Sequence, residues 1–232
     1  MKLNRIDISK VLFLDIETVP MVASYQEMTD KFKVLWDKKA AYLIKDEETP
    51  ESIFQRAGIY AEFGKIVCIS VGFVNGKDDK RELRIKSFAE DDEKKLLSDF
   101  SELLNRYYNK SDSRLCGHNG KEFDFPYIAR RMLVNGLPIP DILDLTGKKP
   151  WEIQHLDTME LWKFGDYKHF TSLNLLAAIF DIPSPKDDID GSQVAGVYYG
   201  EKNLDRIVTY CEKDVKTLIN VFMRYRGEPI LD

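Results

Sequence analysis

The sequence contains few cysteines, which limits the kinds of site that it can form. There are three, with no Cys-x-x-Cys pair, so neither a disulfide framework nor a zinc site is expected. All have apolar neighbours and are predicted to be buried, reduced thiols: Cys68, Cys116 and Cys211. The histidines are too dispersed to indicate a metal site and are expected to be structural: His118, His155 and His169.

Long apolar runs and an excess of basic residues are also absent. No stretch is apolar for long enough to span a bilayer, and Met1–Lys10 lacks the apolar core of a signal peptide, so we expect a cytoplasmic protein. Lys and Arg number 34 against 39 for Asp and Glu, a formal net charge of −5. This balance does not indicate a nucleic-acid-binding protein, although a local basic rim is compatible with an acidic total. Without a P-loop or a Gly-x-Ser-x-Gly elbow, nucleoside triphosphatase and serine hydrolase functions have no support.

The chain is long and apolar enough for one large α/β domain. Of its 232 residues, 44% are hydrophobic, and no internal repeat or linker divides them, so residues 1–232 are expected to form a single domain. Apolar runs and alternation predict strands at 11–16, 65–74, 81–88, 114–119 and 153–159. Helical spacing predicts helices at 90–108, 123–133, 173–180 and 203–226.

The order of these elements predicts a mixed sheet with helices on both faces. The strands at 65–74 and 81–88 should form an antiparallel hairpin within it. A helical insertion is expected at about 21–62, with a second, short helix capped by Thr49 and starting at Pro50. The insertion serves either as a flap beside the end of the first strand or only as packing, and the sequence leaves both readings open.

An acidic pair closes the first predicted strand. Four apolar residues, 11–14, run directly into Asp15 and Glu17. These two are spaced two apart, so in a strand they point to the same face. Two like charges side by side repel, and the usual compensation is a bound cation or a raised pKa. Taken alone, the pair is equally compatible with two solvated acids at a strand end.

Two later segments offer partners for this pair. Asp124 lies in the first turn of a predicted helix, just after the glycine-flanked end of the strand at 114–119. Tyr210 and Asp214 are four residues apart on the closing helix and share one of its faces. Four carboxylates, with no cysteine or histidine cluster nearby in sequence, favour Mg²⁺ or Mn²⁺ over zinc. Roughly four negative charges also balance two divalent ions.

The three segments resemble the exonuclease motifs of the DEDD superfamily, DnaQ-like 3′–5′ exonucleases with a ribonuclease H-like fold. The first motif is Asp15-x-Glu17, and the third, Tyr210-x-x-x-Asp214, marks the tyrosine subclass. The second is especially similar to that of the exonuclease domain of family B DNA polymerases, and it reads Asn119-x-x-x-Phe123-Asp124-x-Pro126-Tyr127. The resemblance extends to Ser172-Leu173 and to the segment 191–194, and so covers nearly the whole chain apart from 21–62.

The resemblance implies a role for each motif residue in a two-metal-ion hydrolysis. Asp15 is expected to bridge both ions, Glu17 and Asp214 to hold the ion that activates water, and Asp124 to hold the second ion. Tyr210 is expected to orient the attacking water, because an ordinary phenol pKa of about 10 favours orientation over proton abstraction. Three residues are candidates to position the terminal nucleotide, with core packing as the alternative for the last of them: Thr18, Asn119 and Phe123.

The activity that follows is metal-dependent release of nucleoside 5′-monophosphates from 3′ ends. Single-stranded DNA is the favoured substrate, because the second motif is most similar to that of DNA polymerases. Expected cofactors are two divalent cations, Mg²⁺ or Mn²⁺, and expected partners are nucleic acid and a replication or repair protein, as in proofreading or DNA repair. Two alternatives stay open: an exoribonuclease of the same superfamily, and a catalytically inactive nucleic-acid-binding module.

Overall fold

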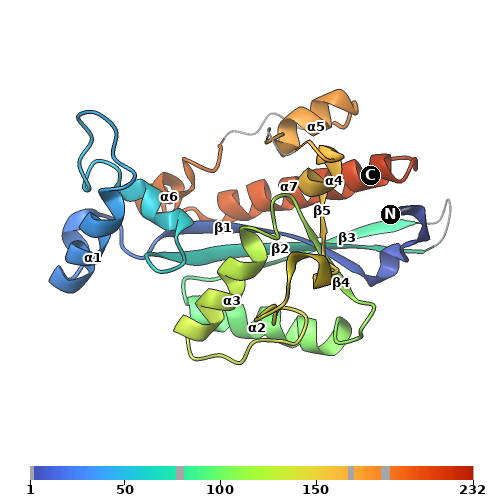
Figure 1. Cartoon of the computed structure of the whole chain (residues 1–232), viewed down its shortest axis with the longest axis horizontal. Coiled ribbons are helices and arrows are strands. Elements are labelled where there is room, and N and C mark those ends of the chain that lie inside the picture. The colour runs from blue at the N-terminus through green and yellow to red at the C-terminus, as the bar shows by residue number, and fades with distance from the viewer. Residues whose placement is uncertain (1–2, 77–80, 167–169, 184–188, 232) are drawn as a thin grey trace.

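A mixed five-stranded sheet lies at the centre of the part of the chain that the structure describes (Figure 1). This computed structural model describes residues 3–76, 81–166, 170–183 and 189–231. The strands are β1 (Val11–Pro20), β2 (Gly64–Asn75), β3 (Glu82–Ala89), β4 (Arg114–Gly117) and β5 (Leu156–Asp157). Their spatial order is β3-β2-β1-β4-β5; β1 pairs antiparallel with β2 and parallel with β4. The mixed sheet and the hairpin predicted from the sequence are thus confirmed.

Helices cover both faces of the sheet, as predicted (Figure 1). On one face, α2 (Glu93–Tyr107) and α3 (Asp124–Val134) pack against Leu12, Leu14 and Ile16 of β1. On the other face, α7 (Leu204–Tyr225) packs against Val11 and Phe13. Side chains alternate along a strand, so the odd-numbered residues that follow in β1 also point toward α7. The acidic pair is therefore aimed at the face covered by the long C-terminal helix.

Shorter helical segments complete the described part of the chain. α4 (Thr158–Lys163) and α5 (Leu173–Ile179) lie beside α7. α6 (Val194–Gly196) continues into the π-helical turn η7 (Val197–Glu201), which precedes α7 in the chain. Single 3₁₀ turns occur at η1 (Leu3–Arg5), η2 (Ile8–Lys10) and η6 (Pro150–Glu152). None of the helices among these described residues is both long and apolar enough to cross a bilayer.

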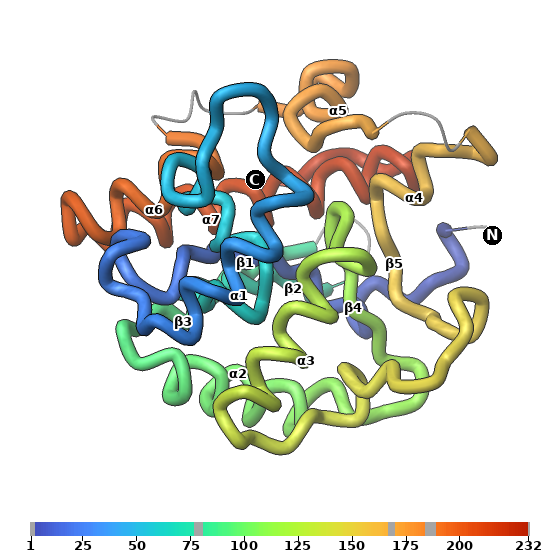
Figure 2. The backbone as a smooth tube through the Cα atoms, turned by 60° about the vertical axis from the view of Figure 1, so that its left-hand side comes forward, coloured from blue at the N-terminus to red at the C-terminus, as the bar shows by residue number. Residues whose placement is uncertain are grey.

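The insertion at 21–62 is less helical than its sequence pattern predicts. Its described α-helix is α1 (Asp30–Ala40), flanked by the 3₁₀ segments η3 (Tyr25–Glu27) and η4 (Phe54–Ile59). Thr49 makes the predicted cap bond, its hydroxyl accepting the Ser52 N–H at 3.1 Å, but residues 50–53 form turns and the helical segment η4 starts only at Phe54. The Pro50 carbonyl accepts the indole N–H of the buried Trp36 at 2.8 Å. Packing around Trp36 thus overrides local helix propensity, and Figure 2 shows the loop between α1 and η4 on the same side of the sheet as α7.

The strand predicted at 153–159 is also shorter in the structure. Only Leu156–Asp157 pairs with β4, and α4 begins at Thr158. The Asp157 carboxylate accepts the N–H groups of Met159 and Glu160 at 3.0 and 3.2 Å. These bonds satisfy two donors that a helix start otherwise leaves unpaired, so the cap ends the strand early.

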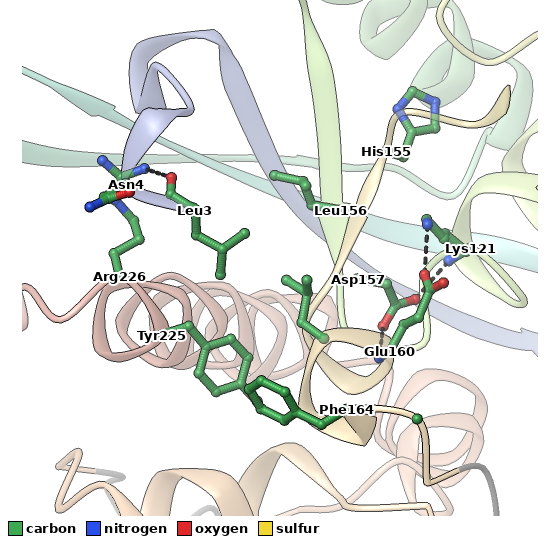
Figure 3. A pocket seen from close by; sticks show the side chains of 12 residues that line it. Leu3, Asn4, Lys121, His155, Leu156, Asp157, Glu160, Phe164, Tyr225 and Arg226 are labelled. Atoms are coloured by element: carbon green, nitrogen blue, oxygen red, sulfur yellow. Dashed lines mark hydrogen bonds and ion pairs between the residues drawn. The ribbon is translucent and has the colours of Figure 1, made fainter. Parts of the chain in front are cut away.

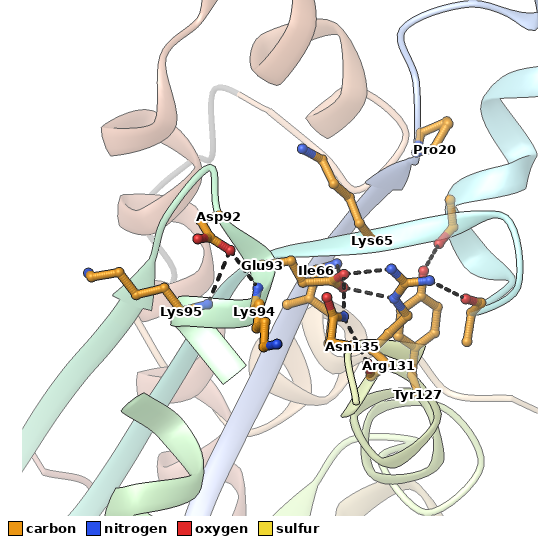
Figure 4. A network of polar contacts seen from close by, with 12 residues as sticks. Pro20, Lys65, Ile66, Asp92, Glu93, Lys94, Lys95, Tyr127, Arg131 and Asn135 are labelled. Carbon is orange, nitrogen blue, oxygen red and sulfur yellow. Dashed lines mark hydrogen bonds and ion pairs between the residues drawn. The ribbon is translucent and has the colours of Figure 1, made fainter. Parts of the chain in front are cut away.

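A buried ion pair joins the insertion to the core (Figure 4). The guanidinium of Arg131 in α3 donates to both carboxylate oxygens of Glu93 in α2, at 2.9 and 2.5 Å. Arg131 also donates to the Ala61 carbonyl at 2.8 Å, and Glu93 accepts the Ile66 N–H at 2.8 Å. One charged pair therefore ties together α2, α3, β2 and the end of the insertion.

Replacing Arg131 with Leu should lower the free energy of unfolding by about 3–5 kcal/mol, because it leaves the Glu93 charge buried without its partner. Denaturant unfolding of the purified protein measures the change. The matched control is Glu82→Gln in the exposed pair with Arg84, which should cost no more than about 1 kcal/mol. Equal small effects in both variants would contradict the anchoring role of the buried pair.

His155 is a buried, neutral histidine, as predicted for a structural one. Its Nδ1 accepts the Leu115 N–H at 3.2 Å, and Nε2 lies 2.8 Å from the Ile142 carbonyl, to which it donates. Burial lowers the pKa of His155 to about 4. His118 is likewise held between the Thr158 hydroxyl and the Thr171 carbonyl, and its pKa is lowered by burial. His169 lies outside the described residues.

His155 should make stability depend on pH between about 6.5 and 4. The unfolded chain binds the proton more readily than the folded one, so this contribution is complete above pH 6.5 and is lost as the pH falls toward 4. This difference between the folded and unfolded pKa of His155 corresponds to about 3 kcal/mol in the free energy of unfolding. We expect the stability difference between wild type and His155→Leu to shrink by that amount from pH 7.5 to pH 4, measured by denaturant unfolding. A difference that does not change with pH would show that the imidazole is not held neutral.

Candidate active site

The acidic pair lies where β1 becomes irregular. Its pairing with β2 shifts at this point: Glu17 is opposite Cys68, whereas Thr18 is opposite Ile66. Such a bulge bends the strand locally and re-aims the neighbouring side chains. One carboxylate oxygen each of Asp15 and Glu17 and the Cys211 sulfur lie within 4.8 Å of one another. The two acids therefore converge on one point, as their spacing predicts.

Asp124 reaches this point from α3. It occupies the first helical position, is only 3% exposed, and its Oδ1 accepts the Ile16 N–H at 3.1 Å. That donor belongs to the residue between Asp15 and Glu17, so the hydrogen bond fixes the third carboxylate beside the first two. The charge of Asp124 raises the pKa of both.

The fourth carboxylate comes from α7. Tyr210 and Asp214 are one turn apart and half-buried, and the Tyr210 hydroxyl donates a hydrogen bond to the Asp214 carboxylate. The charge of Asp214 raises the pKa of both Asp15 and Glu17. Residues from three elements far apart in the sequence thus act on one another electrostatically within one cluster.

The electrostatics of the cluster are unfavourable to the ionised acids. Burial is the largest cause that raises the pKa of Asp15 well above its usual value, followed by the charges of Asp124, Glu17 and Asp214. Burial, followed by the Asp214 charge, also raises the pKa of Glu17. For Asp124, burial raises the pKa to about 7 even though backbone N–H donors favour its ionised form. Positive charge at the centre would relieve this repulsion, and carboxylate oxygens suit divalent cations.

Tyr210 is held as a neutral phenol. Burial is the main cause that raises its pKa, and the charges of Asp214, Glu17 and Asp15 raise it further. Ionisation would add a negative charge to a cluster that already repels negative charge. The Tyr210 hydroxyl can therefore donate or accept a hydrogen bond, but it is poorly suited to act as a base.

Two thiols beside the acids were not anticipated from the sequence. The Cys211 thiol donates to the Asp15 backbone carbonyl at 3.4 Å and contacts its Oδ2 at 3.5 Å, and Cys68 lies opposite Glu17. The three cysteines are free and buried, as predicted. For Cys211, the sequence does hold a signal, because this residue directly follows the motif residue Tyr210. For Cys68 it holds none, because the position of Cys68 depends on the strand register across the bulge.

Two of the three candidate substrate residues, Thr18 and Phe123, are sequence neighbours of the acids Glu17 and Asp124, and Asn119 lies in the loop before α3. Thr18 follows Glu17, and its hydroxyl is hydrogen-bonded to that of Tyr127. Asn119 has a left-handed backbone, with φ of 63°, and its Oδ1 is buried without a donor from the described residues. Phe123 is half-buried against the core, with its ring 5.3 Å from that of Tyr127. Core packing thus accounts for part of the Phe123 surface, and the remainder faces solvent.

Removing one charge from the cluster should stabilise the metal-free protein. At pH 8 we expect Asp15→Asn to raise the free energy of unfolding by about 1 kcal/mol or more, or roughly 2–4 °C in melting temperature. The gain should shrink at pH 5, because the penalty from an acid whose folded pKa is raised builds up as the pH rises from its unfolded pKa, about 4, toward its folded pKa. Calorimetry in a chelating buffer measures both values, and a variant less stable than wild type at pH 8 would contradict the repulsion.

A family model matches residues 59–228, which is most of the chain and includes the second and third acidic segments. Its description is a predicted 3′–5′ exonuclease related to the exonuclease domain of PolB. The match begins within η4 and ends just after α7, so it spans β2 to β5 and the helices on both faces of the sheet. The mixed α/β fold is consistent with such an enzyme, and the chain belongs to this family of predicted 3′–5′ exonucleases.

Proposed function

We propose that the chain is a metal-dependent exonuclease that removes nucleotides from the 3′ end of single-stranded DNA and releases nucleoside 5′-monophosphates. The observation that carries the proposal is the convergence of four carboxylates from β1, α3 and α7, each within electrostatic reach of the Asp15–Glu17 pair. A partly buried cluster of like charges lowers the stability of the fold, and binding of hard cations would offset that cost.

The residues present fit two Mg²⁺ or Mn²⁺ ions. Asp15 is central, since all three other acids raise its pKa, and we assign it to both ions. We assign Glu17 and Asp214 to one ion and Asp124 to the other. Two such ions would activate the attacking water and stabilise the leaving oxygen at phosphorus. In the metal-free protein, burial, followed by Cys68 and the nearby acids, raises the pKa of the Cys211 thiol, and we assign no ion to its sulfur.

Tyr210 and Asn119 are proposed to position the water and the substrate. Tyr210, kept neutral and hydrogen-bonded to Asp214, would orient the water rather than deprotonate it. We assign Asn119 to the terminal nucleotide from its place in the second motif; its Oδ1 has no donor among the described residues but is buried, so the side chain would have to turn to accept from the 3′ hydroxyl. The solvent-facing part of Phe123, together with Thr18, would contact the terminal nucleotide, since stacking on an aromatic ring tolerates any base.

The proposed setting is DNA repair or proofreading in trans for a replication partner, in the cytoplasm. Three buried free cysteines suit a reducing compartment. DNA is preferred to RNA because the family is related to the exonuclease domain of a DNA polymerase. A paired degradation assay on DNA and RNA oligonucleotides of equal sequence decides this point, and a strong preference for RNA ends would overturn the DNA assignment.

Mononucleotide release should depend on Mn²⁺ and on Asp15. In a Mn²⁺ titration with a 3′-labelled oligonucleotide, Asp15→Ala should lose about 1,000-fold in rate or more, because positioned catalytic ions lower the barrier by several kcal/mol. Tyr210→Phe should lose about 10- to 100-fold while retaining Mn²⁺ binding, as expected for a group that only orients. Chromatography of the products identifies nucleoside 5′-monophosphates.

Equal activity of wild type and Asp15→Ala would assign the activity to a contaminant or to a different site. Loss of Mn²⁺ binding in Tyr210→Phe would contradict the orienting role of the phenol. Binding of oligonucleotides without any hydrolysis, at every Mn²⁺ or Mg²⁺ concentration, would show instead a catalytically inactive nucleic-acid-binding module.

A further inference from the structure

Asp157 is a buried acid that none of the three motifs includes. It ends the edge strand β5 and is 3% exposed. Its carboxylate accepts four backbone N–H groups, two of them from the start of α4 as an ordinary helix cap. The other two come from a different segment: Asn119 donates to Oδ1 at 3.0 Å and Lys121 donates to Oδ2 at 3.1 Å. Figure 3 shows Asp157 beside Lys121 and Glu160.

The second pair of bonds holds the loop that connects β4 to α3. This loop turns sharply: the backbone of Asn119 is left-handed, and a Cβ added to Gly120 would lie 3.0 Å from the Cα of Gly117. In so tight a turn, the N–H groups of Asn119 and Lys121 point inward to the Asp157 carboxylate. Without it, these partly buried donors would lose their partner, and the loop would have to shift to pair them with water.

The same loop is continuous with the active-site acid of α3. The Asn119 carbonyl accepts the N–H groups of Glu122 and Phe123, and the Gly120 carbonyl accepts that of Phe125. These bonds wind the loop directly into the first turn of α3. Asp124 lies in that turn and reaches the Ile16 N–H of β1. A displacement of the loop would therefore move both the Asn119 amide and the Asp124 carboxylate.

We propose that Asp157 is a positioning residue for the exonuclease site. Through the N–H groups of Asn119 and Lys121 it sets the loop that aims Asn119 at the terminal nucleotide and Asp124 at its metal ion. It contacts neither substrate nor ion itself. The inference rests on the proposed function, because the consequence of misplacing Asp124 is the loss of one of two ions. It also explains why an acid, rather than any capping residue, occupies the end of β5: four donors need the two oxygens of a carboxylate.

The chain offers a matched control in Asp92, which caps α2. Its Oδ1 accepts the N–H groups of Lys94 and Lys95 at 3.0 and 3.2 Å, the same pair of cap bonds that Asp157 makes to α4. Among the described residues, Asp92 receives no bond from a second segment. Serine is also a good helix cap but is shorter than aspartate. Asp157→Ser and Asp92→Ser should therefore both keep their caps, and only the former loses the bonds to the loop.

The first measurement is hydrogen exchange of single backbone amides by NMR in the metal-free protein. Asp157→Ser should reduce the protection of the Asn119 and Lys121 amides at least about 10-fold, whereas Asp92→Ser should leave them unchanged. The second is Mn²⁺ calorimetry on the same proteins. Asp157→Ser should lower the affinity for the more weakly bound Mn²⁺ ion by about 10- to 100-fold. The affinity for the more tightly bound ion should stay within about 3-fold of wild type.

Unchanged protection of the two amides, or unchanged affinity for both ions despite lost protection, would overturn the positioning role. Should Asp157→Ser fail to fold, Asp157→Asn keeps one acceptor oxygen and should show the same pattern with smaller changes. A wild-type protein that binds no Mn²⁺ and cleaves no oligonucleotide would contradict the proposed function instead, while the exchange measurement still reports on the loop contact.

Discussion

Repulsion among buried and half-buried carboxylates is the constraint on which the site depends. Four acids from three elements share one small region beside β1, and each makes ionisation of the central pair harder. A protein selected for stability alone would replace one of them. Their presence together on one strand and two helices is understandable if divalent cations supply the missing positive charge, and the same cations are what phosphodiester hydrolysis needs. The same four carboxylates would then both lower the stability of the metal-free protein and bind the catalytic ions.

The scaffold holds these charges by ordinary means. Alternation along β1 aims two acids at α7, and the helix in turn presents Tyr210 and Asp214 from one face. The bulge opposite Cys68 bends the strand at the site, and the Ile16 N–H locks Asp124 against it. Away from the site, the buried Glu93–Arg131 pair secures the helices behind the sheet to the insertion. The site results from a strand, a turn and two helices that place charges beside the central strand β1.

Most of the sheet and the long helices were predictable from the sequence, because their apolar periodicity is strong and local. The helix at 203–226 and the hairpin at 65–88 are examples, and the spacing of Asp15 and Glu17 was sufficient to predict their common direction. The insertion was not predictable, since its form depends on packing around Trp36 rather than on propensity. The placement of Cys68 and the role of Asp157 also escaped prediction. Both depend on which residues lie opposite across the sheet, and a bulge or a short parallel pair is invisible in one sequence.

The most direct test of the account is a crystal structure of the protein soaked in Mn²⁺, with anomalous scattering used to locate the ions. We expect two peaks roughly 3.5–4 Å apart, with Asp15 contacting both and Glu17, Asp124 and Asp214 completing the oxygen ligands. A single ion held by the Cys211 sulfur, or ions bound elsewhere with the four acids unoccupied, would contradict it.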